Sequence, residues 1–445
     1  MASRSNRWLP RAGWLAAALV MWTTGAAVAQ DGVRVVTLDE AIDRALRVDP
    51  AAIAAEGAVR SARAGVQQAA GAWLPSLNLN SGYANSSNER FDQSTGRLVS
   101  ENYTAQLAAG IDVFTGGRRV AQQRGARAEL GAAGAQERAQ HFQTVLSVTD
   151  GYYAAAAAAE LVGSAEQRLE RARKQLSFAK TRLEVGSATR SDVLRAELEV
   201  GNAELAKVDA ESGLRTARLQ LGRLLGYDEQ VQPAPSALPE QAPSLPSAEL
   251  LAARAEASSP AAVAAKASAS ARRTETYAAY TSYMPTLRLT GGYDWFSFDF
   301  PPDQKSWSYR LLLSFPIFNG FQREANVARA RAAERTAEAR AHDAAIGARI
   351  AAEDAAREIG AAEQRVQIAE RTVELAREDL RVQEQRYQIG NSTILDLQAS
   401  QIALADAEVA WVRARQALGT AVARLEAVLG ETLDQMPTDP DSART

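Results

Sequence analysis

Two stretches of the sequence follow one pattern: RLEVGSATRSDVLRAELEV, from Arg182 to Val200, and RYQIGNSTILDLQASQIAL, from Arg386 to Leu404. Each contains a glycine, Gly186 or Gly390, between two long runs of residues with helical spacing. The two copies lie 204 residues apart. A repeat over this distance indicates that one structural unit, a helical hairpin with its turn at the glycine, is built twice in the chain.

The composition favours long helices. Alanine dominates an apolar content of 46% in the 445-residue chain, and aromatic residues make up only 6%. Alanine, glutamate, arginine, glutamine and leucine are strong helix formers. The absence of cysteine excludes disulfides, thiolate metal sites, cysteine nucleophiles and a lipid-bearing N-terminal cysteine. A net charge of −3 does not suggest nucleic acid as a partner.

The N-terminus has the pattern of a secretion signal. Three arginines precede an apolar run from Trp14 to Val20, and Ala27-Val28-Ala29 supplies small residues for cleavage before Gln30. We therefore expect an exported protein that loses residues 1–29. A cluster of prolines then divides the chain. We expect a first repeat at 30–232, a Pro-rich linker at 233–246, a second repeat at 247–430 and a disordered tail at 431–445.

Each repeat contains segments in which apolar and polar residues alternate, as in β-strands with one buried face. In the first repeat, the run from Tyr103 to Val113 is the clearest of these. We expect β-hairpins at about 77–115, with a polar loop at about 84–102, and at about 287–317, with a turn near Pro301-Pro302. The second hairpin is the shorter one.

Long helical hairpins are expected to follow, at about 118–225 and 322–429. The 67 residues from Arg118 to Glu184 would extend ~100 Å as one helix, and such a helix needs lateral packing along its length. A heptad pattern indicates where it packs. The pattern comprises Ala165, Leu169, Ala172, Leu176, Ala179 and Leu183, is expected to continue with Leu194, Leu198, Gly201, Leu205 and Val208, and recurs at Ala369, Val373, Ala376 and Leu380.

The four predicted strands have an apolar face that must be buried, and their sheet must close if it lies in lipid. An exported protein must bury such a face against a core or against lipid, and the sequence predicts no second sheet to cover it. A sheet in lipid has to close into a barrel, because unpaired strand edges are not tolerated there. Membrane barrels need at least ~8 strands, so several chains must contribute. Aromatic residues near the strand ends fit an interfacial girdle; they are Tyr83, Tyr103, Tyr293, Trp295, Trp307 and Tyr309.

At this point the sequence resembles a known family, the TolC-type outer membrane factors. The resemblance extends from about Val35 to Gly430 and depends on the order and repetition of several motifs. These are VTLDEAIDRALRVDP near the start, WLPSLNLNSGY and YMPTLRLTGGY before the strands, DVFTGGRR and IFNGFQRE after them, and RxxxGxxxxxD at both turns.

The resemblance implies a mainly α-helical chain with a small membrane β-barrel portion. Three chains would form a 12-stranded barrel in the outer membrane of a Gram-negative bacterium and a coiled-coil tube across the periplasm. The protein would be a passive exit duct of a tripartite efflux pump or a type I secretion system. Its partners would be a periplasmic adaptor, an inner membrane transporter of RND or ABC type, and outer membrane lipids. The resemblance implies no cofactor.

The strand pattern assigns faces within such a barrel. Lipid-facing positions are expected to include Tyr103, Leu107, Ile111, Tyr309, Leu311 and Leu313. Thr104, Gln106 and Asp112 would then face the lumen.

The turns supply the candidate functional residues. Asp192 and Asp396 each follow a turn glycine by six residues, where an acid stabilises a helix start. Alternatively, they form a carboxylate ring that closes the periplasmic tip and attracts cations. In the family, aromatic and basic residues brace the second turn. Tyr387 fits the aromatic role, and Ser392 occupies the place where the basic partner is sought.

Glycine at both turns fits a backbone with positive φ. The family resemblance adds a second role, an adaptor-docking groove at Val185, Gly186 and Ser187 and at Ile389, Gly390 and Asn391.

Enzymatic activity has little support in the sequence. His141 and His342 are the only histidines, and no nucleotide-binding, serine-hydrolase or zinc-protease motif occurs. We therefore expect no catalytic and no metal site. The alternative to a channel is a periplasmic coiled-coil scaffold or adaptor. The apolar strand faces favour the channel, because a scaffold has no use for them.

Overall fold

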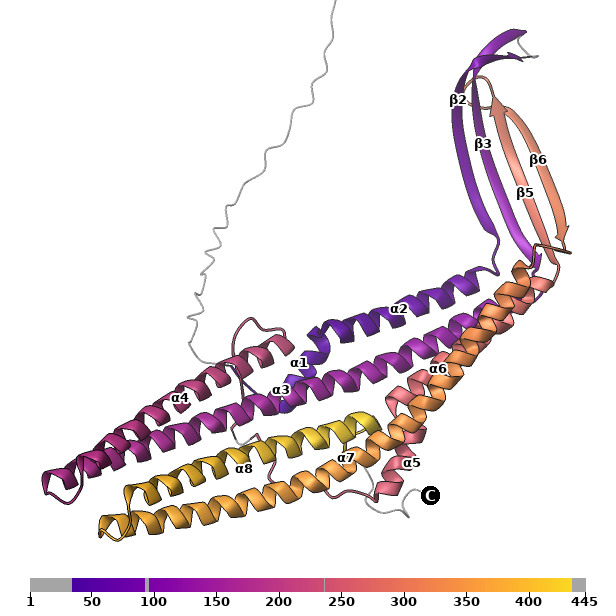
Figure 1. Cartoon of the computed structure of the whole chain (residues 1–445). Coiled ribbons are helices and arrows are strands. Elements are labelled where there is room, and N and C mark those ends of the chain that lie inside the picture. The colour runs from indigo at the N-terminus through magenta and orange to yellow at the C-terminus, as the bar shows by residue number, and fades with distance from the viewer. Residues whose placement is uncertain (1–33, 93–95, 236, 434–445) are drawn as a thin grey trace, which may run out of the picture. The chain divides into compact units, whose positions relative to one another are not determined.

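The computed structural model describes residues 34–92, 96–235 and 237–433 (Figure 1). The helices in these ranges are α1 (Leu38–Val48), α2 (Pro50–Gly71), α3 (Arg118–Glu184), α4 (Arg190–Leu224), α5 (Ala248–Ser258), α6 (Pro260–Tyr280), α7 (Gln322–Gln388) and α8 (Ile394–Leu429), with the short 3-10 helix η1 (Thr281–Tyr283). The strands are β1 (Arg34–Val36), β2 (Ser76–Asp92), β3 (Arg97–Phe114), β4 (Val231–Pro233), β5 (Thr286–Ser297) and β6 (Gln304–Ser314). The expected signal peptide lies outside the described residues.

The main sheet is antiparallel, with the strand order β2-β3-β5-β6. It contains both expected hairpins. The prediction of a polar loop at 84–102 was wrong, because β2 continues to Asp92 and β3 begins at Arg97. Backbone groups make the hydrogen bonds between strands, so polar side chains at exposed positions do not interrupt the pairing.

A second, two-stranded sheet was not expected from the sequence. β1 and β4 pair in parallel, with Arg34 opposite Val231 and Val36 opposite Pro233. The first residue of the expected linker therefore belongs to a strand. Strands of three residues are too short to show a period of two, which explains why the sequence did not predict this sheet.

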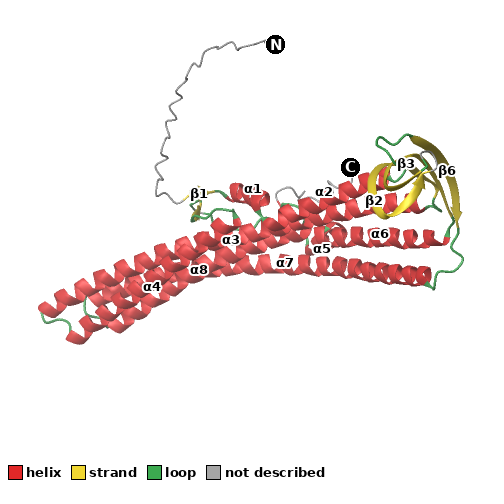
Figure 2. Ribbon diagram, turned by 90° about the horizontal axis from the view of Figure 1, so that it is seen from above, coloured by secondary structure: helices red, strands yellow, loops and turns green. Residues whose placement is uncertain are grey.

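The two longest helices have the expected boundaries. α3 and α7 each contain 67 residues, and each follows the last strand of a hairpin. α3 packs on α2 and α6 in its first half and on α4 and α8 in its second half (Figures 1 and 2). Toward the turns the helices form a layer in the order α4-α3-α8-α7, because α4 packs chiefly on α3, and α7 on α8. α4 and α7 are the lateral edges of this layer.

The expected heptad is correct for α7, correct for α3 except at the exposed Leu183, and wrong for α4. Leu169, Ala172 and Ala179 are buried on α3, as are Val373 and Leu380 on α7. On α4, the residues that pack on α3 include Val193, Ala196 and Ala203, whereas the expected Leu194, Leu198, Gly201, Leu205 and Val208 are exposed. The apolar spacing of α4 marks its outer face, and small alanines make the contact with α3.

The linker packs against the helices. Leu238 is 3% exposed and lies with Ala156 of α3 and Val412 of α8. Arg415 of α8 donates to the carbonyl of Leu238 at 2.8 Å and to the Glu160 carboxylate at 2.9 Å. The linker is therefore fixed over the joint between the two halves. The chain also remains packed beyond Gly430, where the tail was expected to begin, because Leu433 is buried; residues 434–445 lie outside the described part.

Two equivalent arginines fix the junctions between strands and helices. Arg119 of α3 donates to the carbonyl of Val113 at 3.1 Å, and its guanidinium lies 4.5 Å from the ring centre of Trp73. Arg323 of α7 donates to the carbonyl of Pro316 at 2.7 Å and lies 4.8 Å from the ring of Tyr283. Each arginine thus ties the chain that leads from the sheet into its own helix to the end of the preceding helical segment.

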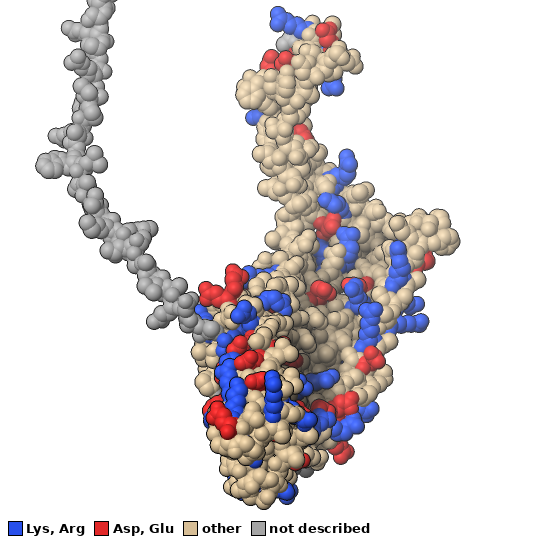
Figure 3. All heavy atoms as spheres, turned by 60° about the vertical axis from the view of Figure 1, so that its left-hand side comes forward, with Lys and Arg blue, Asp and Glu red and all other residues tan. Residues whose placement is uncertain are grey.

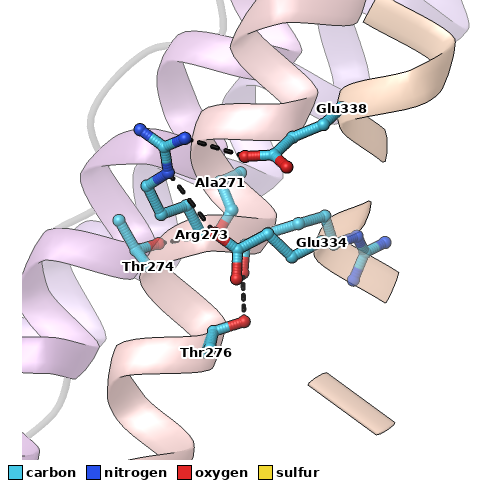
Figure 4. A network of polar contacts seen from close by, with 7 residues as sticks. Ala271, Arg273, Thr274, Thr276, Glu334 and Glu338 are labelled. Atoms are coloured by element: carbon cyan, nitrogen blue, oxygen red, sulfur yellow. Dashed lines mark hydrogen bonds and ion pairs between the residues drawn. The ribbon is translucent and has the colours of Figure 1, made fainter. Parts of the chain in front are cut away.

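An ion-pair cluster joins α6 to α7 (Figure 4). Arg273 of α6 contacts Glu338 at 2.7 Å and Glu334 at 3.4 Å, both on α7. The side chains of Arg273 and Glu338 are exposed and that of Glu334 is partly buried, so the Arg273–Glu338 pair contributes alignment more than stability.

Candidate functional site at the hairpin turns

Both helical hairpins reverse direction through the same backbone motif. Gly186 has φ +76° and Gly390 has φ +82°, in the left-handed region that glycine adopts without a Cβ clash. In each turn the glycine amide donates to the carbonyl three residues earlier, and the next amide donates to the carbonyl five residues earlier. These two bonds satisfy carbonyls at the end of the long helix, which is the reason for glycine at this place.

The two aspartates occupy the third helical position and do not form the cap itself. Thr189 caps α4, and the Asp192 carboxylate accepts from the Thr189 amide and hydroxyl, both at 2.8 Å. Thr393 and Asp396 repeat the arrangement at α8, with distances of 3.0 and 2.7 Å. The helix-stabilising role is thus observed as a capping box, in which threonine is the cap and aspartate accepts its hydrogen bonds.

The environment of Asp396 favours its charged form. Hydrogen bonds from the hydroxyl and amide of Thr393 lower the pKa of the Asp396 carboxyl, and the hydroxyl of Ser392 adds a weaker contact. Ser392 therefore faces an acid of its own turn.

The basic partner of Tyr387 is Arg182, from the first hairpin. Its Nη1 donates to the carbonyl oxygen of Tyr387 at 2.7 Å, and its guanidinium lies 4.9 Å from the centre of the tyrosine ring. Its Nη2 donates to the carbonyl of Ser187 at 3.0 Å. Sequence reasoning did not identify Arg182. The available signal was its place in the RxxxGxxxxxD pattern at both turns.

Tyr387 is held between the hairpins and is only 4% exposed. Its ring packs 6.0 Å from that of Phe178, centre to centre, and lies in a cluster with buried residues of α3, α4 and α8. Burial raises the pKa of the Tyr387 phenol, although the charge of Arg182 opposes this effect. The negative charge of Asp192 also acts on the phenol, which links one expected tip acid to the expected aromatic residue.

A groove of about 260 Å³ lies on one side of this joint. Its lining comprises Arg171, Lys174, Gln175, Phe178, Glu384, Tyr387, Gln388 and Gln401. Below it, the buried Glu408 of α8 contacts Arg171 of α3 at 3.4 Å and Arg377 of α7 at 3.7 Å. Charged contacts therefore cross between the hairpins at more than one level.

The expected docking residues lie in the two turns, where each turn exposes one apolar side chain. Val185 is 74% exposed and Ile389 is 71% exposed, and they occupy equivalent positions of the two turns. Ser187 and Asn391 are also exposed. The structure thus presents two similar apolar points at the ends of the hairpins.

The strand residues lie at the other end of the long helices. The register places Leu107 opposite Leu79 and Tyr293, and Ile111 opposite Leu289. All six expected lipid-facing positions share one face of the sheet, namely Tyr103, Leu107 and Ile111 with Tyr309, Leu311 and Leu313.

On the opposite face, polar side chains of neighbouring strands contact one another. Gln106 donates to Asp294 at 2.7 Å, and Asp112 lies 3.8 Å from Arg288. On the side shown in Figure 3, charged groups gather over the helices, and the strand region is largely uncharged below its far end. Among the described residues, no helix is both long and apolar enough to cross a bilayer.

Comparison with known proteins identifies the family. The family model described as outer membrane efflux protein matches residues 41–227 and 251–431, which include both hairpins and exclude the linker. The chain belongs to this family. Membership supports an outer membrane exit channel for efflux or secretion, and the scaffold alternative is not favoured. It also supports location in the outer membrane.

Individual relatives of this outer membrane efflux protein are moderately similar. Protein CyaE of Bordetella pertussis is 30% identical over 306 residues, which cover 66% of this chain and 62% of that protein. The match therefore spans less than two thirds of the relative.

Solved structures share the fold. The structure of CusC has a TM-score of 0.77 at 19% identity, covering 91% of this chain and 96% of CusC. The outer membrane protein VceC of Vibrio cholerae has a TM-score of 0.73 at 19% identity, with 89% and 96% covered. The open MtrE channel of Neisseria gonorrhoeae has a TM-score of 0.74 at 21% identity, with 90% of each chain covered.

Proposed function

We propose that three copies of this chain form a closed passive duct from the periplasm of a Gram-negative bacterium through its outer membrane. The observation that carries the proposal is that, within the described residues, two helices of the helical layer and two strands of the sheet are left as unpaired edges. Such a chain can satisfy its edges by joining copies of itself head to tail in a ring.

The helical edges carry a second apolar stripe. On α4, exposed Leu198 and Leu205 each follow a buried alanine, Ala196 or Ala203, by two residues. Two residues correspond to ~200° around a helix, so these leucines point away from α3. α7 has the same arrangement, with exposed Leu375 two residues after buried Val373. We infer that the outer stripe of α4 packs on that of α7 in the next copy.

The sheet edges are β2 and β6 among the described strands. β6 of one copy would pair with β2 of the next. Three copies would give a 12-stranded barrel, with the face of Leu107 and Tyr309 toward lipid and the face of Gln106 and Asp112 toward the lumen. Closure removes strand edges that lipid could not satisfy.

The hairpin turns would form the periplasmic tip. Val185 and Ile389 are the points at which an adaptor with an apolar groove could dock, because they are exposed at the ends of both hairpins. Threefold symmetry would place six carboxylates, from Asp192 and Asp396, around the tip. We propose that the adaptor and an inner membrane transporter of RND or ABC type open this end, and that the transporter supplies the energy for efflux or type I secretion.

The mass of the complex in detergent tests this function. We expect three times the mass of the mature chain, and a monodisperse monomer would contradict the proposal. Leu205→Asp should weaken the complex because it places a charge in the apolar contact between copies. Ser177→Asp is the matched control, since it adds the same charge to an exposed position of α3, which is not an edge helix of the layer. Equal effects of both changes would argue against the α4–α7 contact.

A further inference from the structure

The β2–β3 hairpin extends past the rest of the sheet. β5 pairs with β3 only as far as Tyr103, which lies opposite Ser297, whereas β3 begins at Arg97. The six residues 97–102 therefore project beyond β5, by about 20 Å at a rise of ~3.3 Å per residue. In the described part of the chain, this end of the hairpin has no neighbouring strand on either side.

A β-bulge redirects the projecting end. Residues 86–89 of β2 stand opposite the single residue Ser100 of β3, and regular pairing resumes at Arg90 and Val99. Additional residues in one strand bend the ladder and increase its twist. Figure 1 shows the upper end of this hairpin turning away from the direction of the strands below it.

Two large apolar side chains lie beyond the bulge. Phe91 and Leu98 are directly opposite each other in the register, and each is more than 60% exposed. Side chains alternate along a strand, so Leu98 lies on the same side of β3 as Thr104 and Gln106. The polar face of the sheet thus ends in an apolar pair, on the side that faces the lumen in a closed barrel.

The opposite face shows where the lipid-facing band ends. The rings of Tyr83 and Tyr103 are 5.1 Å apart, centre to centre, and that of Phe300 lies 5.7 Å from Tyr103. Aromatic residues mark the boundaries of the apolar band in membrane barrels. Phe91 and Leu98 lie past this boundary, where water and not lipid surrounds the hairpin. Lipid is therefore not the partner of this pair.

We propose that Phe91 and Leu98 of three copies meet around the threefold axis and form an apolar ring that narrows the outer mouth of the channel. The proposal rests on the proposed function, because the polar face lines a lumen only in the closed trimer. The partner of each pair is the same pair in the other copies, since all three project on the lumen side at one level. An apolar constriction hinders ions and small polar solutes by dewetting. A two-stranded hairpin joined to the sheet at one end can still yield to a larger cargo.

Cysteine cross-linking tests the contact. The chain has no cysteine, so single thiols can be introduced at Phe91→Cys or Leu98→Cys without a background. A disulfide requires Cα atoms within ~7 Å. Oxidation of the purified trimer should yield covalent dimers with at least one of these variants. Val99→Cys is the matched control, because Val99 is the next residue and points to the other side of β3. Cross-linking no greater for the two variants than for Val99→Cys would overturn the proposal.

Access to the lumen provides the second test. A water-soluble thiol reagent added from outside should label Thr104→Cys several-fold faster when Phe91→Ser and Leu98→Ser are also present. Phe300→Ser, which removes an exposed aromatic residue at the outer end on the other face, should leave the rate unchanged. An unchanged rate in the double serine variant would contradict the constriction. The mass of every variant is measured first: a monomer would refute the duct itself, whereas a trimer without cross-links refutes only the ring.

Discussion

The guanidinium of Arg182 donates to the carbonyl oxygen of Tyr387 at 2.7 Å and lies 4.9 Å from the centre of its ring. This contact joins the end of α3 to the end of α7. A further bond from Arg182 to the Ser187 carbonyl, at 3.0 Å, includes the first turn in the same connection. One side chain thus holds the ends of both hairpins, and any separation of the tips has to break its bonds.

Removing this side chain should loosen the tip. Arg182→Ala deletes charge-assisted hydrogen bonds, which are worth ~1.5–3 kcal/mol when shielded, and we expect larger conductance in planar bilayers. Arg386→Ala is the control, because Arg386 has the same place in the second copy and is exposed. Equal conductance of the two variants would argue that Arg182 does not hold the tip closed.

Neutralising the tip acids should separate their charge from their structural role. Asp192→Asn and Asp396→Asn keep an oxygen that can accept from the capping threonine and lose the negative charge. If six carboxylates surround the opening, both variants should show reduced cation selectivity and weaker block by trivalent cations, with little loss of thermal stability. Unchanged selectivity and block in the double asparagine variant, together with earlier melting of the alanine variants, would assign the acids to capping alone.

The contribution of Asp396 to stability should depend on pH. Its pKa is lowered in the folded protein by hydrogen bonds from Thr393, so its ionised form stabilises the start of α8 at pH values above the unfolded pKa of about 3.9. This contribution should disappear as the pH falls through the lower, folded-state pKa. Wild type should therefore melt later than Asp396→Ala at neutral pH, and the difference should vanish in strong acid. A difference that persists in acid would contradict this assignment.

The two faces of the sheet should differ in access to water. Single cysteines at Thr104, Gln106 and Asp112 should react with a water-soluble reagent that enters the lumen, and cysteines at Leu107 and Ile111 should react poorly. The reason is that the register places these groups on opposite faces of one sheet. The measurement is the labelling rate in membranes. Equal rates for the two sets would remove the barrel from the proposed function.

Close packing between the hairpins should be sensitive to one methyl group. A Cβ at Gly419 of α8 would lie 2.6 Å from the ring of Tyr153 of α3. Gly419→Ala should therefore destabilise the protein by ~1–3 kcal/mol, as overpacking does. Gly360→Ala is the control, since a Cβ there meets nothing within 4 Å, and alanine suits a helix better than glycine. The midpoints of thermal unfolding distinguish these outcomes.

The sequence predicted those features that depend on local periodicity. The repeat, the 67-residue helices and the grouping of β3 and β6 residues on common faces of the sheet follow from spacing alone. The sequence did not predict contacts in which one apolar stripe could pack on either of two neighbouring helices. The leucines of α4 have the heptad spacing of a helix–helix contact, yet alanines face α3. The spacing of apolar residues does not determine which neighbouring helix they contact.

The polar contacts were also beyond prediction from the sequence. Arg182 contacts a residue 205 positions away, and only the packing of α3 beside the second hairpin brings the two together. Asp192 was expected to stabilise the helix start, and the structure shows that the cap itself is Thr189, three residues earlier. Both residues suit a cap, and the choice between them depends on where the turn motif ends.

The equal length of α3 and α7 constrains how this chain can change in evolution. An insertion of one residue in either helix would move its turn by ~1.5 Å and rotate it by ~100°, which would separate Arg182 from Tyr387. An insertion or deletion can preserve the heptad contacts between the helices only if it comprises about seven residues. It must also be made in both the outgoing and the returning helix of both hairpins. Natural variation in the reach of such a channel should therefore be discrete, with matched changes 204 residues apart in one gene.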